Sequence, residues 1–222
     1  MDLKDYSNYC VIFDMDGVLA DTSPIHFESW VKLAKEIGFK FTREFFERTC
    51  GQQSPTIIRK LVGTDIEQDL VEKWASIKEK YYREMIQQKL EPLPGAVELI
   101  NRLKSKGFKL ALGSSAPPEN VELLLTGLKI KKIFDIVVTA ADVDKSKPEP
   151  DVFLMASKKL KVKPQNCIVI EDAPVGIEAA KRAGMKTIAL TTTYDWRELQ
   201  DAQIILKDLT NLKISKIIKL FT

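Results

Sequence analysis

The chain has 222 residues, 45% of them apolar, and 34 basic residues set against 31 acidic ones give a net charge of +3. A chain of this size and composition can bury one good core and a small second one, so one or two domains are expected. The charge is too small and too evenly spread to favour nucleic acid as a partner.

The first residues carry charges where a signal peptide would be apolar, and no 18 apolar residues run together. Cys10, Cys50 and Cys167 lie far apart and in no metal-binding spacing, which predicts free thiols in a reducing cytosol rather than a zinc site or a disulfide. We therefore expect a cytoplasmic monomer. Residues 211–221 are predicted to form a terminal helix packed on the core, and a membrane-binding helix is the alternative.

The first predicted element is an apolar strand at residues 11–13, which runs into Asp14-Met15-Asp16-Gly17. A continuous apolar run fits a strand covered on both faces, as in a parallel sheet, and Gly17 marks the turn out of it. If the backbone stays extended to Asp16, both carboxylates leave the same side of the strand. Like charges at about 4 Å repel by roughly 4 kcal/mol at an effective dielectric near 20, so the pair needs a cation or a shared proton. The alternative is a pair that caps backbone donors.

Residues 22–92 are predicted to be a helical insert. Thr22 is expected to cap a helix that has Pro24 in its first turn and ends at Gly38, and the pattern stays helical from residue 42 to residue 90. Prolines and glycine at residues 91–95 then break it. We expect a core domain of residues 1–21 and 93–222, and a small helical cap domain of residues 22–92.

After this break, helices and strands alternate. Helices are predicted over residues 96–106, 120–128, 151–160 and 175–183, and strands over residues 108–112, 134–138, 167–170 and 187–190, with a short strand at residues 204–206 before the terminal helix. This alternation predicts an α/β fold with a doubly wound parallel sheet and right-handed crossovers.

Polar residues follow the ends of the predicted strands. They are Asp14 and Asp16, Ser114, Lys147 in the loop after the third strand, and Glu171 with Asp172. In such sheets, ligands bind outside the carboxyl ends of the strands. Carboxylates with a lysine and a hydroxyl suit a hard cation such as Mg²⁺, which in turn suggests phosphate. Taken singly, Lys147 is better explained as a solvated lysine, and Ser114 is equally well explained as a cap of the next helix.

All these motifs together resemble those of the haloacid dehalogenase superfamily, in particular its β-phosphoglucomutase-like subgroup with a small helical cap. The resemblance covers nearly the whole chain. The four family motifs are matched in order by Asp14-Met15-Asp16-Gly17-Val18, by Ser114, by Lys147-Pro148, and by Glu171-Asp172 with Gly176-Ile177 after it.

The resemblance implies a role for each of these residues. Asp14 would attack phosphorus to form an aspartyl-phosphate, and Asp16 would protonate the leaving oxygen and later deprotonate water. Mg²⁺ would be held by Asp14, Asp172 and the backbone carbonyl of Asp16, with Glu171 as a direct or water-bridged ligand. Ser114, beside Ser115, and Lys147 would hold the phosphoryl oxygens. Because Asp16 must begin protonated, we expect its neighbours to raise its pKa.

The cap is expected to contact the leaving group and so to determine which substrates are bound. His26, the only histidine, matches a histidine of the mutase subgroup and is expected beside Asp16. The loop at residues 50–55 resembles the one that faces the active site, so Gly51, Gln52 and Gln53 are expected to bind substrate. It carries no cation, and Ser54 stands where the mutases have an arginine for a second phosphate.

The expected function is therefore that of a Mg²⁺-dependent phosphatase, and neutral amides favour a sugar or polyol phosphate as its small phosphorylated substrate. A β-phosphoglucomutase-type phosphomutase is the alternative within the family. A non-catalytic sensor of a phosphorylated metabolite is the alternative from another class.

Overall fold

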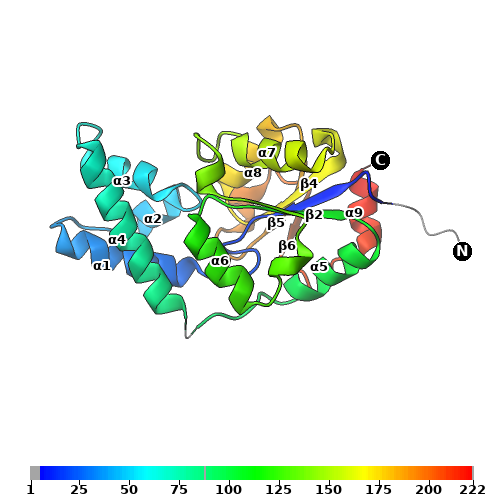
Figure 1. Ribbon diagram of the computed structural model, residues 1–222, viewed down its shortest axis with the longest axis horizontal. Helices are drawn as coiled ribbons and strands as arrows, with labels where there is room; N and C mark the ends of the chain where they lie inside the picture. Colours follow the sequence, from blue (N-terminus) through cyan, green and yellow to red (C-terminus); the bar gives the residue numbers. More distant parts are fainter. Residues whose placement is uncertain (1–5, 88, 222) are drawn as a thin grey trace, which may run out of the picture.

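The computed structural model describes residues 6–87 and 89–221, and its centre is a six-stranded sheet (Figure 1). The strands are β1 (Cys10–Phe13), β2 (Lys109–Gly113), β3 (Ile136–Val138), β4 (Cys167–Glu171), β5 (Lys186–Leu190) and β6 (Ile204–Leu206). All neighbours pair in parallel in the order β3-β2-β1-β4-β5-β6. The order reverses at β1, which lies between β2 and β4, so the predicted doubly wound parallel sheet is confirmed.

Helices cover both faces of the sheet. Successive side chains of a strand point to opposite faces, so the apolar residues of β1 must be buried on both sides. Val11 and Phe13 of β1 pack with α5 (Ala96–Ser105), α6 (Pro118–Gly127) and α9 (Ile214–Leu220). Cys10 and Ile12 pack on the other face with α7 (Asp151–Leu160) and α8 (Pro174–Arg182). The terminal helix thus packs on the core, as expected, through the buried side chain of Ile217.

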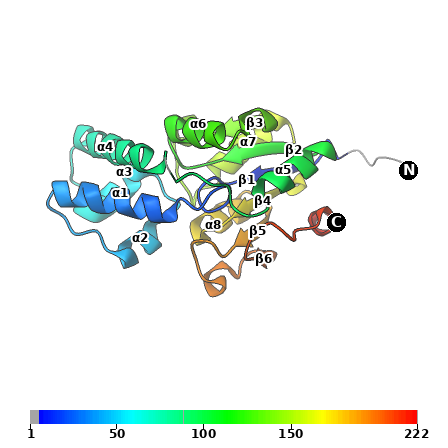
Figure 2. The ribbon, with the colours of Figure 1, turned by 90° about the horizontal axis from the view of Figure 1, so that it is seen from below.

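Four helices between β1 and α5 lie together beyond the carboxyl ends of the strands (Figures 1 and 2). They are α1 (Ser23–Glu36), α2 (Arg43–Thr49), α3 (Ser54–Val62) and α4 (Gln68–Ile86). They share an apolar cluster of their own, in which the rings of Trp30 and Phe41 stack with centroids 5.3 Å apart. We call these four helices the cap helices.

The predicted elements are present with small shifts at their ends. The helix α6 begins at Pro118 rather than at residue 120, because proline fits the first turn of a helix, where no intrahelical partner for its nitrogen is needed. The strand β3 is shorter than predicted, because it begins at Ile136 and not at residue 134; a 3₁₀ turn at Lys131–Ile133 precedes it. In the described part of the chain no helix is long and apolar enough to cross a membrane.

Candidate active site

The loop that leaves β1 places two carboxylates at the edge of the sheet. The N–H of Asp14 donates to the carbonyl of Ile170 at 2.9 Å, so the pairing of β1 with β4 continues one residue past the strand. The chain then turns at Gly17, whose φ of +72° suits glycine. A Cβ atom at Gly17 would lie 1.8 Å from Asp172 Oδ2, so the absence of a side chain lets this turn approach Asp172.

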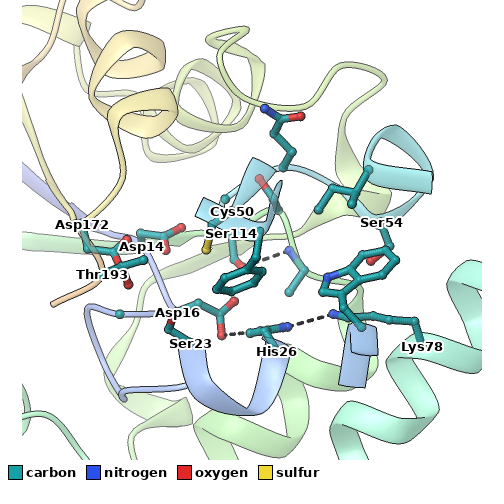
Figure 3. Close-up of a pocket in the computed structure, with 18 of the residues that line it drawn as sticks. Asp14, Asp16, Ser23, His26, Cys50, Ser54, Lys78, Ser114, Asp172 and Thr193 are labelled. Carbon is teal, nitrogen blue, oxygen red and sulfur yellow. Dashed lines mark hydrogen bonds and ion pairs between the residues drawn. The ribbon is translucent and has the colours of Figure 1, made fainter. Parts of the chain in front are cut away.

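Lys147 joins the ends of β1 and β4. Its Nζ lies 2.6 Å from Asp14 Oδ1 and 2.6 Å from Glu171 Oε1, and its side chain is 1% exposed. The alternative of a solvated lysine is therefore wrong. Ser114, at the end of β2, is also buried and lines the same pocket as Asp14 and Asp172 (Figure 3). Its Oγ accepts the N–H of Ala116 at 3.1 Å in the loop before α6 (Pro118–Gly127), and α6 has no side-chain cap, so the alternative that Ser114 caps this helix is wrong.

Three buried carboxylates form a group suited to a metal ion. Asp14, Glu171 and Asp172 each offer an oxygen, and these oxygens lie within 4.8 Å of one another. Both oxygens of Glu171 already have partners, because Oε1 bonds to Lys147 and Oε2 accepts the N–H groups of Asp172 and Ala173 at 2.7 Å. Glu171 is further confined by Gly176, where a Cβ would lie 1.8 Å from Oε1. Asp14 and Asp172 thus have more freedom than Glu171 to bind a cation.

The charges of this group are out of balance, since one ammonium faces three carboxylates. Burial and the charges of Glu171 and Asp16 raise the pKa of Asp14 to about 7, although Lys147 opposes them. Burial and the charges of Glu171 and Asp14 also raise the pKa of Asp172 well above its usual range. Oxygen ligands with an excess of negative charge fit Mg²⁺.

Without a bound metal ion, the free energy of unfolding of the protein is therefore expected to fall as the pH rises from about 4 to about 7. The folded state holds the Asp14 proton with a pKa of about 7 against an ordinary value of 3.8, so its contribution to stability is lost through this range. Thermal unfolding in EDTA measures this loss. Mg²⁺ at 100 times its Kd should restore about 2.7 kcal/mol at pH 8.

Variants test whether the loss comes from this group. Asp172→Asn in EDTA at pH 8 should be more stable than the unmodified protein, because one of the repelling charges is gone. It should also respond less to Mg²⁺. Asp201→Asn, which alters a mostly exposed ion pair with Lys181, is the matched control and should change neither quantity. Equal responses of the two variants would contradict this metal site.

Asp16 faces the cap helices, and its carboxylate is not part of the metal group. Its Oδ1 accepts a hydrogen bond from the hydroxyl of Thr22 at 2.6 Å. The same oxygen lies 3.1 Å from His26 Nε2 (Figure 3). His26 is thus beside Asp16, where it was expected. Thr22 was expected to cap α1 through its side chain, and this was wrong: it makes no side-chain cap, because its hydroxyl is used by Asp16.

The expectation of a raised pKa for Asp16 is also wrong. Burial raises this pKa, but the positive charges of His26 and Lys78 and the hydrogen bonds from His26 and Thr22 outweigh it, so the net shift is downward. Asp16 is therefore ionised at neutral pH in the protein without substrate. In that form it is ready to act as a base, and it must take up a proton before it can act as an acid.

The loop at residues 50–53 brings a further part of the cap region to the pocket. Gly51 and Gln52 line the pocket over Asp14, and so does Ser115 of the core. A Cβ at Gly51, with φ of +87°, would lie 2.9 Å from Val175 Cγ2, so glycine lets the loop sit against the start of α8. Gln53 was expected beside them but lines a neighbouring groove instead.

The structure adds two charged residues that sequence reasoning missed, Lys78 and Glu79 of α4. The predicted lack of a cation holds for the loop, but buried Lys78 lines the pocket, with Nζ 2.8 Å from His26 Nδ1 and 3.0 Å from Glu79 Oε1. A signal was present, because Lys78 shares the buried stripe of α4 with Val71, Ala75 and Tyr82. Thr193, after β5, also lines the pocket and was not predicted.

Comparisons with known proteins agree with this site. A model of the haloacid dehalogenase-like hydrolase family matches residues 11–190. A phosphorylated carbohydrates phosphatase of Thermotoga maritima is 34% identical over 182 residues, which cover 80% of this chain and 82% of that protein. A β-phosphoglucomutase of Bacillus subtilis is 37% identical over 188 residues, which cover 81% of this chain and 82% of that protein.

A solved structure shows the same arrangement of elements. The β-phosphoglucomutase from Clostridium difficile matches with a TM-score of 0.88 at 30% identity, over 96% of each chain.

Proposed function

Since this chain belongs to the haloacid dehalogenase-like hydrolase family, we propose that it is a Mg²⁺-dependent phosphatase of a small phosphorylated metabolite. A sugar or polyol phosphate is the favoured substrate, and an aspartyl-phosphate is the proposed intermediate. The observation that carries the proposal is the division between the two aspartates. Asp14 lies with Lys147 and the metal group, whereas Asp16 is hydrogen-bonded to Thr22 and His26.

This division assigns one chemical task to each aspartate. A carboxylate oxygen of Asp14 forms a bond to phosphorus while the bond from phosphorus to the leaving oxygen breaks, and Asp16 supplies the proton to that oxygen. Asp16, again ionised, then takes a proton from the water that attacks the aspartyl-phosphate. This step releases inorganic phosphate and returns Asp14 to its carboxylate form.

The charge of the phosphoryl group is offset from the core side. Lys147 uses two N–H groups for Asp14 and Glu171 and has a third for a phosphoryl oxygen. Ser114 accepts from Ala116 through its oxygen, so its hydroxyl hydrogen can donate to the same group. Mg²⁺ held by Asp14, Asp172 and the backbone carbonyl of Asp16, with Glu171 beside them, would neutralise a further part of this charge.

The cap helices are proposed to move, with residues 22–92 as the cap and residues 1–21 and 93–222 as the core. The pocket over Asp14 has a volume of about 60 Å³, whereas small-molecule sites usually have roughly 300–1,000 Å³. His26, Lys78 and Ser54 reach this pocket from the cap helices. Opening would admit the substrate, and closing would place Asp16 and its partners against the leaving group.

The β-phosphoglucomutase relatives make a phosphomutase the second candidate. A mutase must keep water from the aspartyl-phosphate while a second phosphate of the substrate is bound, and cations favour that binding. The position expected for an arginine is Ser54, and the charge of Lys78 is offset by Glu79. These two features favour hydrolysis over transfer.

One experiment separates the candidates. The protein is incubated with Mg²⁺ and a panel of hexose and polyol monophosphates, including β-glucose 1-phosphate with catalytic glucose 1,6-bisphosphate. Inorganic phosphate and glucose 6-phosphate are both measured, with EDTA as the control. We expect Mg²⁺-dependent phosphate release to dominate. Efficient formation of glucose 6-phosphate with little free phosphate would establish the mutase, and no turnover of any compound would favour a sensor.

A further inference from the structure

A second cavity, which we call the groove, lies beside the pocket over Asp14. It has a volume of about 710 Å³ and lies between α3 and α4 on one side and the loops after β2 and β3 on the other. Ser54, Glu79 and Ser115 line both the pocket and the groove, so the two spaces adjoin at these residues. The groove is within the roughly 300–1,000 Å³ of small-molecule sites, and the pocket alone is not.

Glu79 is held rigidly at the junction of the two spaces. Its Oε1 accepts the hydroxyl of Ser54 and lies 3.0 Å from Lys78 Nζ, and its Oε2 accepts the side-chain N–H of Asn120 at 2.6 Å. Burial raises the pKa of Glu79, but the charges of Lys78 and His26 and the hydrogen bond from Ser54 outweigh it, so the pKa is lowered. A fixed, ionised carboxylate therefore lies where the pocket and the groove adjoin.

The charges beyond this junction do not favour a second anion either. Glu72 and Glu119 line the groove, and Arg83 is the one basic residue among the described residues that line it. Arg83 already donates from Nη1 to Asn120 Oδ1 at 2.9 Å. Hydroxyl groups, by contrast, can donate to carboxylates and accept from amides such as Gln53.

We propose that the leaving group of the substrate extends from the pocket past Glu79 into the groove, and that Glu79 restricts it to uncharged, hydroxyl-bearing groups. This inference rests on the phosphatase activity proposed above and specifies its substrate class. The substrates include monophosphates of sugars or polyols longer than one sugar ring, and bisphosphates are rejected.

The first test compares kcat/KM for fructose 1-phosphate and fructose 1,6-bisphosphate in Glu79→Gln. The change removes the charge and keeps the shape of the side chain. We expect the preference for the monophosphate to fall about tenfold, because the junction then carries the uncompensated charge of Lys78. Glu84→Gln, an exposed position on the same helix that lines neither space, should leave the preference within twofold. No change in Glu79→Gln, or equal changes in both variants, would overturn the role of Glu79.

The second test narrows the groove with Ser76→Trp, an exposed position of α4 that lines it. Trehalose 6-phosphate and a panel of other disaccharide monophosphates are compared with glucose 6-phosphate. We expect the ratio of kcat/KM, disaccharide over hexose, to fall at least tenfold. An unchanged ratio, or unmodified protein that hydrolyses hexose phosphates but none of the disaccharide phosphates, would overturn the extension into the groove.

The two proposals fail in different ways. If no phosphate monoester, including an aryl phosphate, is hydrolysed with Mg²⁺, the phosphatase itself is wrong and the inference falls with it. If hydrolysis is found but neither ratio moves, the phosphatase stands and the inference about the leaving group is wrong.

Discussion

Replacement of Asp14 by asparagine is expected to lower phosphate release by at least about 10⁴-fold, because the amide cannot form the aspartyl-phosphate. The backbone bond from Asp14 to Ile170 and the contact with Lys147 can both persist in this variant, so the fold should be intact. Steady-state release of phosphate and the thermal unfolding midpoint are the two measurements.

The unfolding midpoint separates loss of chemistry from loss of fold. In EDTA at pH 8, Asp14→Asn should unfold at the same temperature as the unmodified protein or higher, since it has one fewer of the three crowded carboxylates. Asp201→Asn serves again as the control and should keep full activity. Undiminished turnover in Asp14→Asn would remove the covalent mechanism.

Replacement of Asp16 by alanine is expected to lower kcat/KM most for substrates whose leaving oxygen must be protonated as it departs. General acid–base catalysis contributes about 10²–10⁴-fold. A sugar hydroxyl is a poor leaving group and needs the proton of Asp16, whereas p-nitrophenolate departs without it. We therefore expect a loss in kcat/KM near the upper end of this range for a sugar phosphate and a much smaller loss for p-nitrophenyl phosphate.

The pH dependence of kcat/KM should also differ between the two substrates. Because the pKa of Asp16 is lowered, only a small fraction of Asp16 is protonated at neutral pH, and this fraction falls further as the pH rises. Above the pH at which Asp14 is ionised, kcat/KM for a sugar phosphate should therefore decline with rising pH. For p-nitrophenyl phosphate the profile should be flatter, and Asp16→Ala should show no such decline for either substrate. Equal losses of kcat/KM for both substrates in Asp16→Ala would exclude Asp16 as the acid.

Much of the core side of the site follows from local sequence patterns. Apolar runs that end in Asp14, Ser114 and Glu171-Asp172 predict strands followed by polar groups, and parallel strands bring their carboxyl ends to the same edge of a sheet. The meeting of Lys147 with Asp14 and Glu171 agrees with that geometry. The terminal helix and the cap helices can also be predicted from local sequence, because the apolar face of a helix is formed by residues only three or four positions apart.

The cap side of the site was decided by tertiary packing. Lys78 meets His26, and Glu79 meets Ser54 and Asn120, across separations of 25 to 52 positions in the chain. No local pattern fixes which of these polar groups are buried together, because that depends on how α1, α3, α4 and α6 cross.

The same contacts set the electrostatics. The downward shift in the pKa of Asp16 arises because opposing charges and hydrogen bonds from His26, Thr22 and Lys78 outweigh its burial. Thus the sequence by itself determined the sheet, the cap helices and the residues at the strand ends. The tertiary structure alone decided which charges face the leaving group, because Coulomb energies depend on distance through space and on burial.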